Sequence, residues 1–325
     1  MPRYDEILRN YSEDRPLTRE EAIVLLQTPD EQLGELIKKA GELRRKYKGN
    51  KVSVQLLTNV RSGNCSQDCA YCAQSCGSTA DIGKYRSIPD EKLYADNSVV
   101  NEKHLARHCI GLSGMSFTDG EIAELADRIR AMKQTGTHIC CSIGFLTEKQ
   151  ARMLRDAGLD RINHNLNTSR RFYPNICSTH TYEQRIENLR MLKRIGFEIC
   201  CGGIIGMGES REDRLDMALE LAEAGVRSVP INALIPVKGT PLEDLERITE
   251  ADILRTVAIF RFILPEADIR LAAGRDLMAN CGERAFRSGA NSAITGDMLT
   301  TSGNSIADDI EMLHSIGLDT GRCSQ

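Results

Sequence analysis

The chain has 325 residues and a formal net charge of −4, with 27% charged and 41% hydrophobic residues, a composition typical of a soluble globular protein. It has no basic excess, only 5% aromatic residues and no tryptophan, so nucleic-acid binding is not expected. No run approaches the roughly 18 apolar residues of a membrane helix, and the N-terminal segment lacks a signal-peptide core, so we expect a cytoplasmic protein without membrane contact.

The first fifty residues are expected to be helical. Thr18 and Glu21 have the spacing of a helix-capping box, and Thr28 and Glu31, with a proline after Thr28, predict a second helix start. Gly49 then ends the last of these helices. The sequence does not decide whether this extension covers one end of the main domain or forms a subunit interface.

From residue 51 onward, short β-branched apolar runs alternate with amphipathic segments. Eight runs are predicted strands: 52–59, 107–112, 138–143, 160–166, 197–205, 228–235, 268–274 and 291–295. The clearest predicted helices lie near 119–134, 147–157, 181–195, 211–224, 250–263 and 306–316. The expected helix starts are Thr147, Thr181 and Ser210, and the glycines expected to end helices are Gly136, Gly158, Gly196 and Gly225.

This alternation predicts an α/β fold with a parallel sheet. Eight strand–helix units over this length favour a (βα)8 TIM-type barrel at 51–318, with a helical extension at 1–50 and a C-terminal tail at 319–325. A doubly wound sheet is the alternative, because periodicity does not distinguish a closed sheet from an open one.

Four cysteines lie within the stretch NCSQDCAYCAQSC, at Cys65, Cys69, Cys72 and Cys76. Twelve cysteines in a reducing cytosol indicate metal or redox chemistry rather than a disulfide framework. Structural zinc normally uses paired C-x2-C knuckles or histidines, and no second pair exists here. Three close thiolates on the loop after the first strand instead suit an iron–sulfur cluster with one iron left open.

Three further cysteines lie on separate predicted strands, at Cys109, Cys140 and Cys200. Cys140 and Cys200 each lie four residues after a helix-ending glycine, so we expect them at similar depths. Because side chains alternate along a strand, Cys140 and its neighbour Cys141 point to opposite faces. The cysteines are either small buried core residues or a second metal site.

Polar residues recur at inward-facing positions. Asn163, Asn165 and Asn167 alternate along one predicted strand face, where buried amides are costly unless they bind something. Arg270 lies on a predicted strand, where a buried guanidinium requires an anion, either a sulfide-rich cluster or a carboxylate on a neighbouring strand. Arg185 alone reads as an ordinary surface arginine.

The motif C-x3-C-x2-C with Tyr71 before its last cysteine resembles the radical S-adenosylmethionine (SAM) superfamily. The stretches AGLDRINHNLNTS, CGGIIGMGES, SVPINALIPVKGTPL, IRLAAGR and SGANSAITGDMLTT resemble the biotin synthase family, with a match over about 50–318. This resemblance implies insertion of sulfur into dethiobiotin to form biotin. A 5′-deoxyadenosyl radical would abstract hydrogens, and an auxiliary cluster would supply the sulfur.

The resemblance also implies roles for individual residues. The implied ligands of a [4Fe–4S] cluster are Cys65, Cys69 and Cys72, and those of an auxiliary cluster are Cys109, Cys140, Cys200 and Arg270. The implied SAM contacts are Tyr71, Asn165, Asn167, Arg185, Gly206, Gly208 and Glu209, and the implied substrate contacts are Asn163, Asn232 and Thr300. Cys76 is read as a non-ligand, because a fourth ligand would close the open iron.

The auxiliary cluster is expected to be [2Fe–2S]. A larger four-iron cluster with extra sulfide is the alternative, because the chain adds Cys141, Cys177, Cys201, Cys281 and Cys323 to the usual set. The resemblance also implies a flavodoxin- or ferredoxin-type electron donor and a homodimer. Two other readings are a related radical SAM enzyme, of the hydrogenase-maturation or methylornithine-synthase type, and a non-catalytic iron–sulfur or zinc protein.

Overall fold

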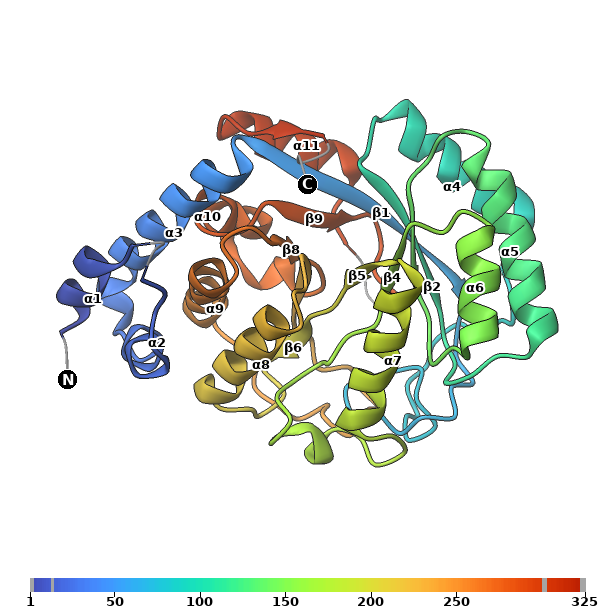
Figure 1. Ribbon diagram of the computed structural model, residues 1–325, viewed down its shortest axis with the longest axis horizontal. Helices are drawn as coiled ribbons and strands as arrows, with labels where there is room; N and C mark the ends of the chain where they lie inside the picture. Colours follow the sequence, from blue (N-terminus) through green and yellow to red (C-terminus); the bar gives the residue numbers. More distant parts are fainter. Residues whose placement is uncertain (1–2, 13–14, 300–302, 322–325) are drawn as a thin grey trace.

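The structure is a computed structural model and describes residues 3–12, 15–299 and 303–321 (Figure 1). Its α-helices are α1 (Tyr4–Asn10), α2 (Arg19–Leu26), α3 (Leu33–Lys48), α4 (Asp90–Glu102), α5 (Asp119–Lys133), α6 (Glu148–Asp156), α7 (Tyr182–Ile195), α8 (Arg211–Glu223), α9 (Glu250–Ile263), α10 (Glu283–Arg287) and α11 (Ile306–Ser315). Its 3-10 helices are η1 (Asp30–Gln32), η2 (Tyr173–Asn175), η3 (Arg275–Leu277) and η4 (Ala279–Gly282). Its strands are β1 (Lys51–Arg61), β2 (Arg107–Leu112), β3 (Ile139–Ser142), β4 (Arg161–Asn163), β5 (Glu198–Cys200), β6 (Gly203–Ile205), β7 (Ser228–Ala233), β8 (Asp268–Leu271), β9 (Ser292–Thr295) and β10 (Asp319–Thr320).

The strands close into a parallel barrel. Their order is β1-β2-β3-β4-β5-β7-β8-β9, and β9 pairs back with β1. β6 follows β5 at the same position and pairs with β7. The predicted (βα)8 barrel is therefore confirmed, and the doubly wound alternative is wrong.

The predicted strand 197–205 is interrupted between β5 and β6. A Cβ atom at Gly202 would lie only 2.0 Å from the carbonyl oxygen of Pro230, so only glycine fits where the chain passes this close to β7. The Gly202 N–H donates to the side-chain oxygen of Asn165 at 3.1 Å, outside the strand ladder. The interruption thus brings an asparagine of the neighbouring segment onto the backbone.

Two local predictions are wrong. The predicted strand 160–166 ends at Asn163, because the following residues leave the ladder and Asn167 takes a left-handed conformation with φ of 71°. Thr28 does not start a helix: its hydroxyl donates to the carbonyl of Val24 at 3.3 Å, and α3 begins only at Leu33. A threonine hydroxyl that bonds back to the preceding turn is not available as a cap.

The other predicted helix boundaries are confirmed. Side-chain caps accept from the backbone at Thr18, Thr147, Thr181 and Ser210, and positive φ angles occur at Gly136, Gly158, Gly196 and Gly225. Helix α4 was not among the predicted helices. It begins after Pro89 without a side-chain capping bond, and its Asn-Ser-Val-Val stretch consists of weak helix formers. Burial of Leu93 and Val100 stabilises it instead.

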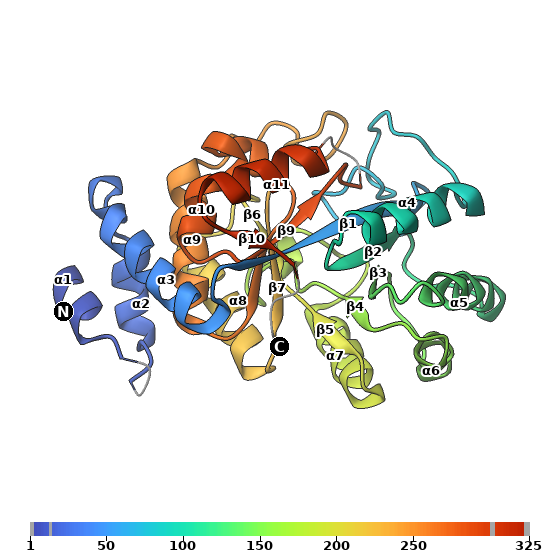
Figure 2. The same cartoon turned by 90° about the horizontal axis from the view of Figure 1, so that it is seen from above.

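The N-terminal helices lie beside the barrel rather than beneath it (Figures 1 and 2), where they pack against α8 and α9. Arg255 of α9 donates to the carbonyl of Thr28 at 2.8 Å and to the carboxylate of Asp30 at 2.6 Å. Lys48, at the end of α3, reaches the amino-terminal end of the barrel. The predicted domain boundary at residue 50 stays a prediction. Strand β10, in the predicted tail, pairs with the start of β1.

Apolar side chains pack mainly between the barrel wall and its helices, as in the buried cluster beneath α5 and α6. The barrel interior holds a separate small cluster of Cys109, Cys140, Ala272 and Ile294. Two thiols therefore take the place of branched aliphatic side chains in the barrel centre. Among the described residues, no helix has the length and apolar character needed to cross a bilayer.

Candidate active site

A cavity of about 360 Å³ opens at the carboxyl ends of the barrel strands. The residues singled out in the sequence that line it are Cys65, Tyr71, Cys72, Cys109, Cys140, Asn163, Asn165, Asn167, Arg185, Asn232 and Arg270. A larger cavity of about 760 Å³ lies at the opposite end, near α7 and α8, but none of the eleven cysteines that the structure describes lines it. The smaller cavity is the candidate site, because it gathers side chains from the first loop and most strands.

The first loop folds back on itself and carries its thiols inward. The backbone N–H of Cys65 donates to the carbonyl of Gln74 at 3.2 Å, and that of Cys72 donates to the carbonyl of Cys69 at 3.0 Å. Cys65 and Cys72 line the cavity, and Cys69 is buried behind them. Cys76 is exposed and does not line the cavity, which supports its reading as a non-ligand.

The loop thiols lie where a metal is needed to ionise them. Burial raises the pKa of Cys72 to about 11. A hydrogen bond with Cys177, together with burial, raises the pKa of Cys69 well above its usual range. A thiolate at either position therefore needs a cationic partner, and iron supplies one. Three thiols on one loop beside a cavity fit the three-cysteine ligand set of a [4Fe–4S] cluster.

Two of the strand cysteines, Cys109 and Cys140, line the same cavity, whereas Cys200 does not line it but contacts Arg270, which does. Cys109 and Cys140 are direct neighbours in the pairing of β2 with β3. Hydrogen bonding within this pair lowers the pKa of Cys109 and raises that of Cys140 to about 12. Cys141 points away and packs beneath α5 and α6, as the strand alternation predicts. Cys200 likewise faces inward, whereas Cys201 belongs to the outer core.

Arg270 lies among these thiols and is 1% exposed. Its Nη1 donates to the Sγ of Cys200 at 3.0 Å, its Nη2 to the hydroxyl of Ser228 at 2.8 Å and its Nε to the hydroxyl of Ser292 at 3.2 Å. Burial raises the pKa of Cys200 well above its usual range. The guanidinium therefore faces a neutral thiol until a metal makes it a thiolate, and this arrangement fits an anionic auxiliary cluster.

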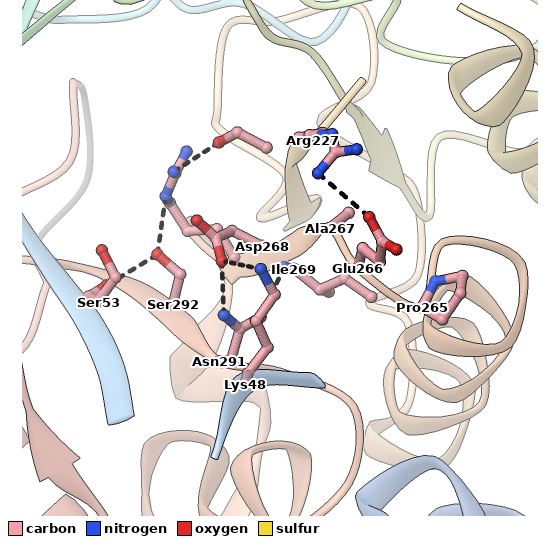
Figure 3. Close-up of polar contacts among 12 residues, drawn as sticks. Lys48, Ser53, Arg227, Pro265, Glu266, Ala267, Asp268, Ile269, Asn291 and Ser292 are labelled. Atoms are coloured by element: carbon pink, nitrogen blue, oxygen red, sulfur yellow. Dashed lines mark hydrogen bonds and ion pairs between the residues drawn. The ribbon is translucent and has the colours of Figure 1, made fainter. Parts of the chain in front are cut away.

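A polar layer closes the barrel beneath Arg270. Lys48 pairs with Asp268 at 3.1 Å, and Asp268 accepts from Asn291 at 2.8 Å (Figure 3). Asp268 precedes Arg270 on β8 by two residues but accepts from Lys48 instead. Among the described residues, no carboxylate is hydrogen-bonded to Arg270, so the alternative of a neighbouring-strand salt bridge is not supported.

The three asparagines all line the cavity, although only Asn163 belongs to a strand. The side-chain oxygen of Asn163 is buried and has no hydrogen-bond partner among the described residues. A buried amide oxygen without a partner is costly, and a bound ligand would satisfy it. Asn165 uses its oxygen on the Gly202 N–H.

Arg185 is half-buried in the cavity wall and is not the surface arginine that its position in a helix suggests. Its Nε donates to the hydroxyl of Tyr173 at 2.6 Å, and its Nη2 lies 3.1 Å from Nε2 of His180. The guanidinium also lies over the ring of Phe145, 5.6 Å from the centroid. The side chain is thus held in place on several sides, as a carboxylate-binding arginine requires.

Other predicted contacts are occupied by the protein itself or lie elsewhere. The carboxylate of Glu209 accepts from the N–H groups of Gly206 and Met207 and pairs with Arg214 at 2.7 Å, so it shapes the turn. Neither Gly208 nor its neighbours in this turn line the cavity. The amide of Asn232 bonds to the backbone at both ends. Thr300 and Cys323 lie outside the described residues.

The sequence did not reveal several residues of the site. Gln55 accepts from the thiol of Cys109 at 3.2 Å, and the hydroxyls of Ser228 and Ser292 receive the guanidinium of Arg270. Each of these residues is a polar residue at an inward position of an otherwise apolar strand, and this pattern is the signal that could have revealed them. It was applied only to the asparagines and to Arg270.

Comparison with known proteins gives the class. A radical SAM superfamily profile matches residues 59–222, and a Biotin and Thiamin Synthesis associated domain matches residues 230–319. A solved methylornithine synthase has the same fold, with a TM-score of 0.82 at 18% identity over 98% of this chain and 97% of that one. The hydrogenase maturase HydG from Carboxydothermus hydrogenoformans gives 0.83 at 16% identity, over 99% and 80% of the two chains. A barrel with three thiols on its first loop is that of a radical SAM enzyme.

Curated relatives narrow this class. Biotin synthase from Alkaliphilus metalliredigens is 44% identical over 94% of this chain and 96% of its own length. The enzyme from Clostridium tetani is 42% identical over 96% and 97%, and that from Rhodopirellula baltica is 38% identical over 99% and 90%. The chain belongs to the biotin synthase family.

Proposed function

We propose that this protein converts dethiobiotin to biotin by radical insertion of sulfur. The observation that carries the proposal is the position of Arg270 against Cys200, at the level of the paired thiols Cys109 and Cys140. A second set of inward thiols with a buried arginine has no role in SAM cleavage alone. It supports a second cluster, which a related radical SAM enzyme does not need at this depth.

The cofactors supply the bond-breaking chemistry. When bound, the [4Fe–4S] cluster and SAM supply a 5′-deoxyadenosyl radical for unactivated C–H bonds, and the auxiliary cluster supplies the sulfur. No acid–base pair is needed for such bonds, and none of the proposed contacts is one. Cys65, Cys69 and Cys72 would hold the first cluster, and Cys109, Cys140, Cys200 and Arg270 would hold the second, of [2Fe–2S] type.

The chain's own residues bind and orient the reactants. Arg185, held by Tyr173, would receive the carboxylate of SAM, and Tyr71 would lie against its adenine. Asn165 and Asn167 would approach the ribose, and the free oxygen of Asn163 would accept a hydrogen bond from the substrate. The barrel excludes water around these groups and fixes their order in depth.

We further propose the surroundings in which the enzyme works. Electrons would come from a flavodoxin- or ferredoxin-type protein, the chain would act as a homodimer, and it would work in the cytoplasm. These three statements rest on the resemblance of the chain to the family. Reduction of the clusters by the donor protein, the molecular mass in solution and the location in the cell would test them in turn.

Mössbauer spectroscopy of the anaerobic, iron-57-labelled protein tests the proposal, with iron and sulfide counted on the same sample. We expect two clusters, one of which changes when SAM is added. Cys140→Ala should remove the second cluster and biotin formation but leave SAM cleavage. Cys141→Ala is the matched control, because Cys141 faces the outer core and should leave both clusters in place.

A single cluster in the wild-type protein would contradict the proposal and return the strand cysteines to core packing. Biotin formation by the Cys140→Ala variant would exclude Cys140 as a ligand. Cys72→Ala should abolish SAM cleavage itself. If cleavage persisted in this variant, Cys72 would not be a ligand of the SAM-cleaving cluster. A wild-type protein that cleaved no SAM would instead support the non-catalytic iron–sulfur or zinc alternative.

A further inference from the structure

A second group of soft metal ligands lies beside the first loop. The Sγ of Cys69, the Sγ of Cys177 and a ring nitrogen of His180 all lie within 4.8 Å of one another, and all three residues are buried. Cys177 and His180 belong to the segment between η2 and α7. The function proposed above uses neither of them.

The three ligand atoms have the spacing of a tetrahedral metal site. Sγ of Cys69 lies 3.9 Å from Sγ of Cys177 and 3.9 Å from Nε2 of His180. Sγ of Cys177 lies 3.6 Å from Nε2 and 3.4 Å from Nδ1 of the same ring. Bond lengths of about 2.3 Å to sulfur and about 2.0 Å to nitrogen would separate tetrahedral ligands by about 3.8 Å and about 3.6 Å, respectively. The pairwise spacings therefore match, and rotation of the Cys177 side chain or of the imidazole would direct all three donors at a single ion.

The hydrogen bonds of His180 set the tautomer that a metal requires. Its Nε2 lies 3.1 Å from Nη2 of Arg185, which only donates, so Nε2 carries the lone pair. Its Nδ1, which then carries the proton, lies 2.8 Å from the hydroxyl of Tyr173. A metal-binding histidine is commonly held in this way, with its other nitrogen donating to a fixed partner.

A negative charge lies next to the same atoms. An oxygen of Asp68 lies 3.2 Å from the Sγ of Cys177 and accepts from the backbone N–H groups of Ser178 and Thr179. A water molecule beside this carboxylate would complete four ligands around a divalent ion. Two thiols, an imidazole and a water molecule are a donor set that suits Zn²⁺ and Fe²⁺.

We propose that Cys69, Cys177 and His180 bind a single soft divalent ion, Zn²⁺ or Fe²⁺, when the first loop carries no cluster. Cys69 cannot serve both this ion and the [4Fe–4S] cluster, so the two occupancies exclude each other. Arg185 turns away from Nε2 when the ion binds. Metal held here keeps the loop ordered, and zinc held here competes with cluster assembly.

Cobalt titration of the cluster-free, full-length chain under anaerobic conditions tests this inference. One equivalent of Co²⁺ should give thiolate-to-cobalt absorption in the near ultraviolet and the visible bands of tetrahedral cobalt. Cys177→Ser and His180→Gln should each lower the affinity for this Co²⁺ ion by at least about 100-fold, since each removes a direct ligand. Cys76→Ser, on the same loop but outside the group, is the matched control and should retain it.

Two further variants separate this site from the cluster ligands. Cys65→Ser and Cys72→Ser should leave the cobalt bands intact, because neither thiol belongs to the group. Bands that survive Cys177→Ser, or disappear with Cys65→Ser, would overturn the proposal and place the ion on the loop thiols or the strand thiols. Circular dichroism shows whether each variant is folded. Cys177→Ala is a second substitution that removes the same thiol, in case Cys177→Ser does not fold. The cobalt titration does not depend on biotin formation. The metal-site proposal can therefore fail while the proposed function stands, and the reverse also holds.

Discussion

Arg270 and Cys200 meet inside the barrel, with the guanidinium Nη1 3.0 Å from the thiol sulfur. They lie on β8 and β5, separated in the sheet by β7, so only their inward-facing side chains can touch. Because burial keeps the Cys200 thiol protonated, the guanidinium of the cluster-free chain hydrogen-bonds only to neutral groups among the described residues. The cost of this charge in the apoprotein points to a partner that arrives later.

Arg270→Met should therefore act in opposite directions on the two forms. In the cluster-free chain, the thermal midpoint should stay the same or rise, because an apolar side chain of similar length replaces an unpaired charge. In the reconstituted protein, the iron and sulfide of the second cluster should be lost. Thermal unfolding by circular dichroism and iron counting measure the two effects.

Arg261→Met is the matched control. Arg261 is also fully buried, but it donates to the carbonyls of Gly289, Pro265 and Ala267. Its loss leaves these acceptors unpaired and should cost at least about 3 kcal/mol without changing the iron bound per folded chain. An Arg270→Met protein with unchanged iron would exclude the arginine as part of the cluster site.

Arg185→Lys should weaken SAM binding about 10- to 100-fold, because a lysine loses the two-pronged, charge-assisted contact with a carboxylate. Equilibrium binding of SAM to the cluster-loaded protein measures this change. Arg190→Lys lies on the same helix, outside the candidate site, and should bind SAM normally. Equal affinities in the two variants would rule out the proposed role of Arg185.

The barrel itself was readable in the sequence because it rests on local signals. Capping boxes such as Thr147 with Gln150 and left-handed glycines such as Gly196 mark many of the helix boundaries, and short β-branched runs lie between the helices. The alternation of side chains along a strand also predicted that Cys140 and Cys141 would face opposite ways. Helix α4 was missed, because its stability comes from tertiary burial and not from propensity.

The candidate site was readable only in part, because much of it depends on contacts between distant segments. Nothing in the spacing of Cys69 and Cys177 indicates that their sulfurs lie 3.9 Å apart, 108 positions along the chain. The turn at Asn167 likewise depends on its approach to Gly203, to which it is bridged. The alternation of residues that predicts a strand does not show where a contact of this kind ends it.

The ion pair of Lys48 and Asp268 predicts a pH dependence of stability. Burial alone would raise the pKa of Asp268, but Lys48 at 3.1 Å and the hydrogen bond from Asn291 together lower it. A carboxyl group with a lowered folded-state pKa stabilises the fold above its unfolded pKa of about 3.9. This contribution is lost as the pH falls from about 4 through the folded-state value.

Urea unfolding of the cluster-free wild-type and Asp268→Asn proteins tests this sign. The difference in their midpoints should be constant from about pH 7 to pH 5 and shrink below about pH 4. Lys48→Met, which removes the main cause of the lowered pKa, should shrink or reverse this pH dependence, because burial then raises the folded-state pKa of Asp268. A difference that stays constant at low pH would show that the Asp268 carboxylate adds no such stability.

Arg275 and Asp309 form a buried, two-pronged ion pair that ties α11 to the segment after β8, with distances of 2.8 and 2.6 Å. Their side chains are only 5% and 1% exposed. Asp309→Asn removes the anion and leaves the guanidinium buried, so the free energy of unfolding should fall by about 3–5 kcal/mol. Urea denaturation of the cluster-free protein measures the loss.

Two comparisons isolate the unpaired charge as the cause. The double variant Arg275→Met with Asp309→Leu should recover much of the lost stability, because it removes both charges and keeps the volume filled. Arg287→Met breaks the more exposed pair with Glu283 and should cost less than about 1 kcal/mol. A double variant as unstable as Asp309→Asn would mean that the pair fixes α11 by its hydrogen bonds to the backbone, such as that from Arg275 to the carbonyl of Ile294, and not by charge neutralisation.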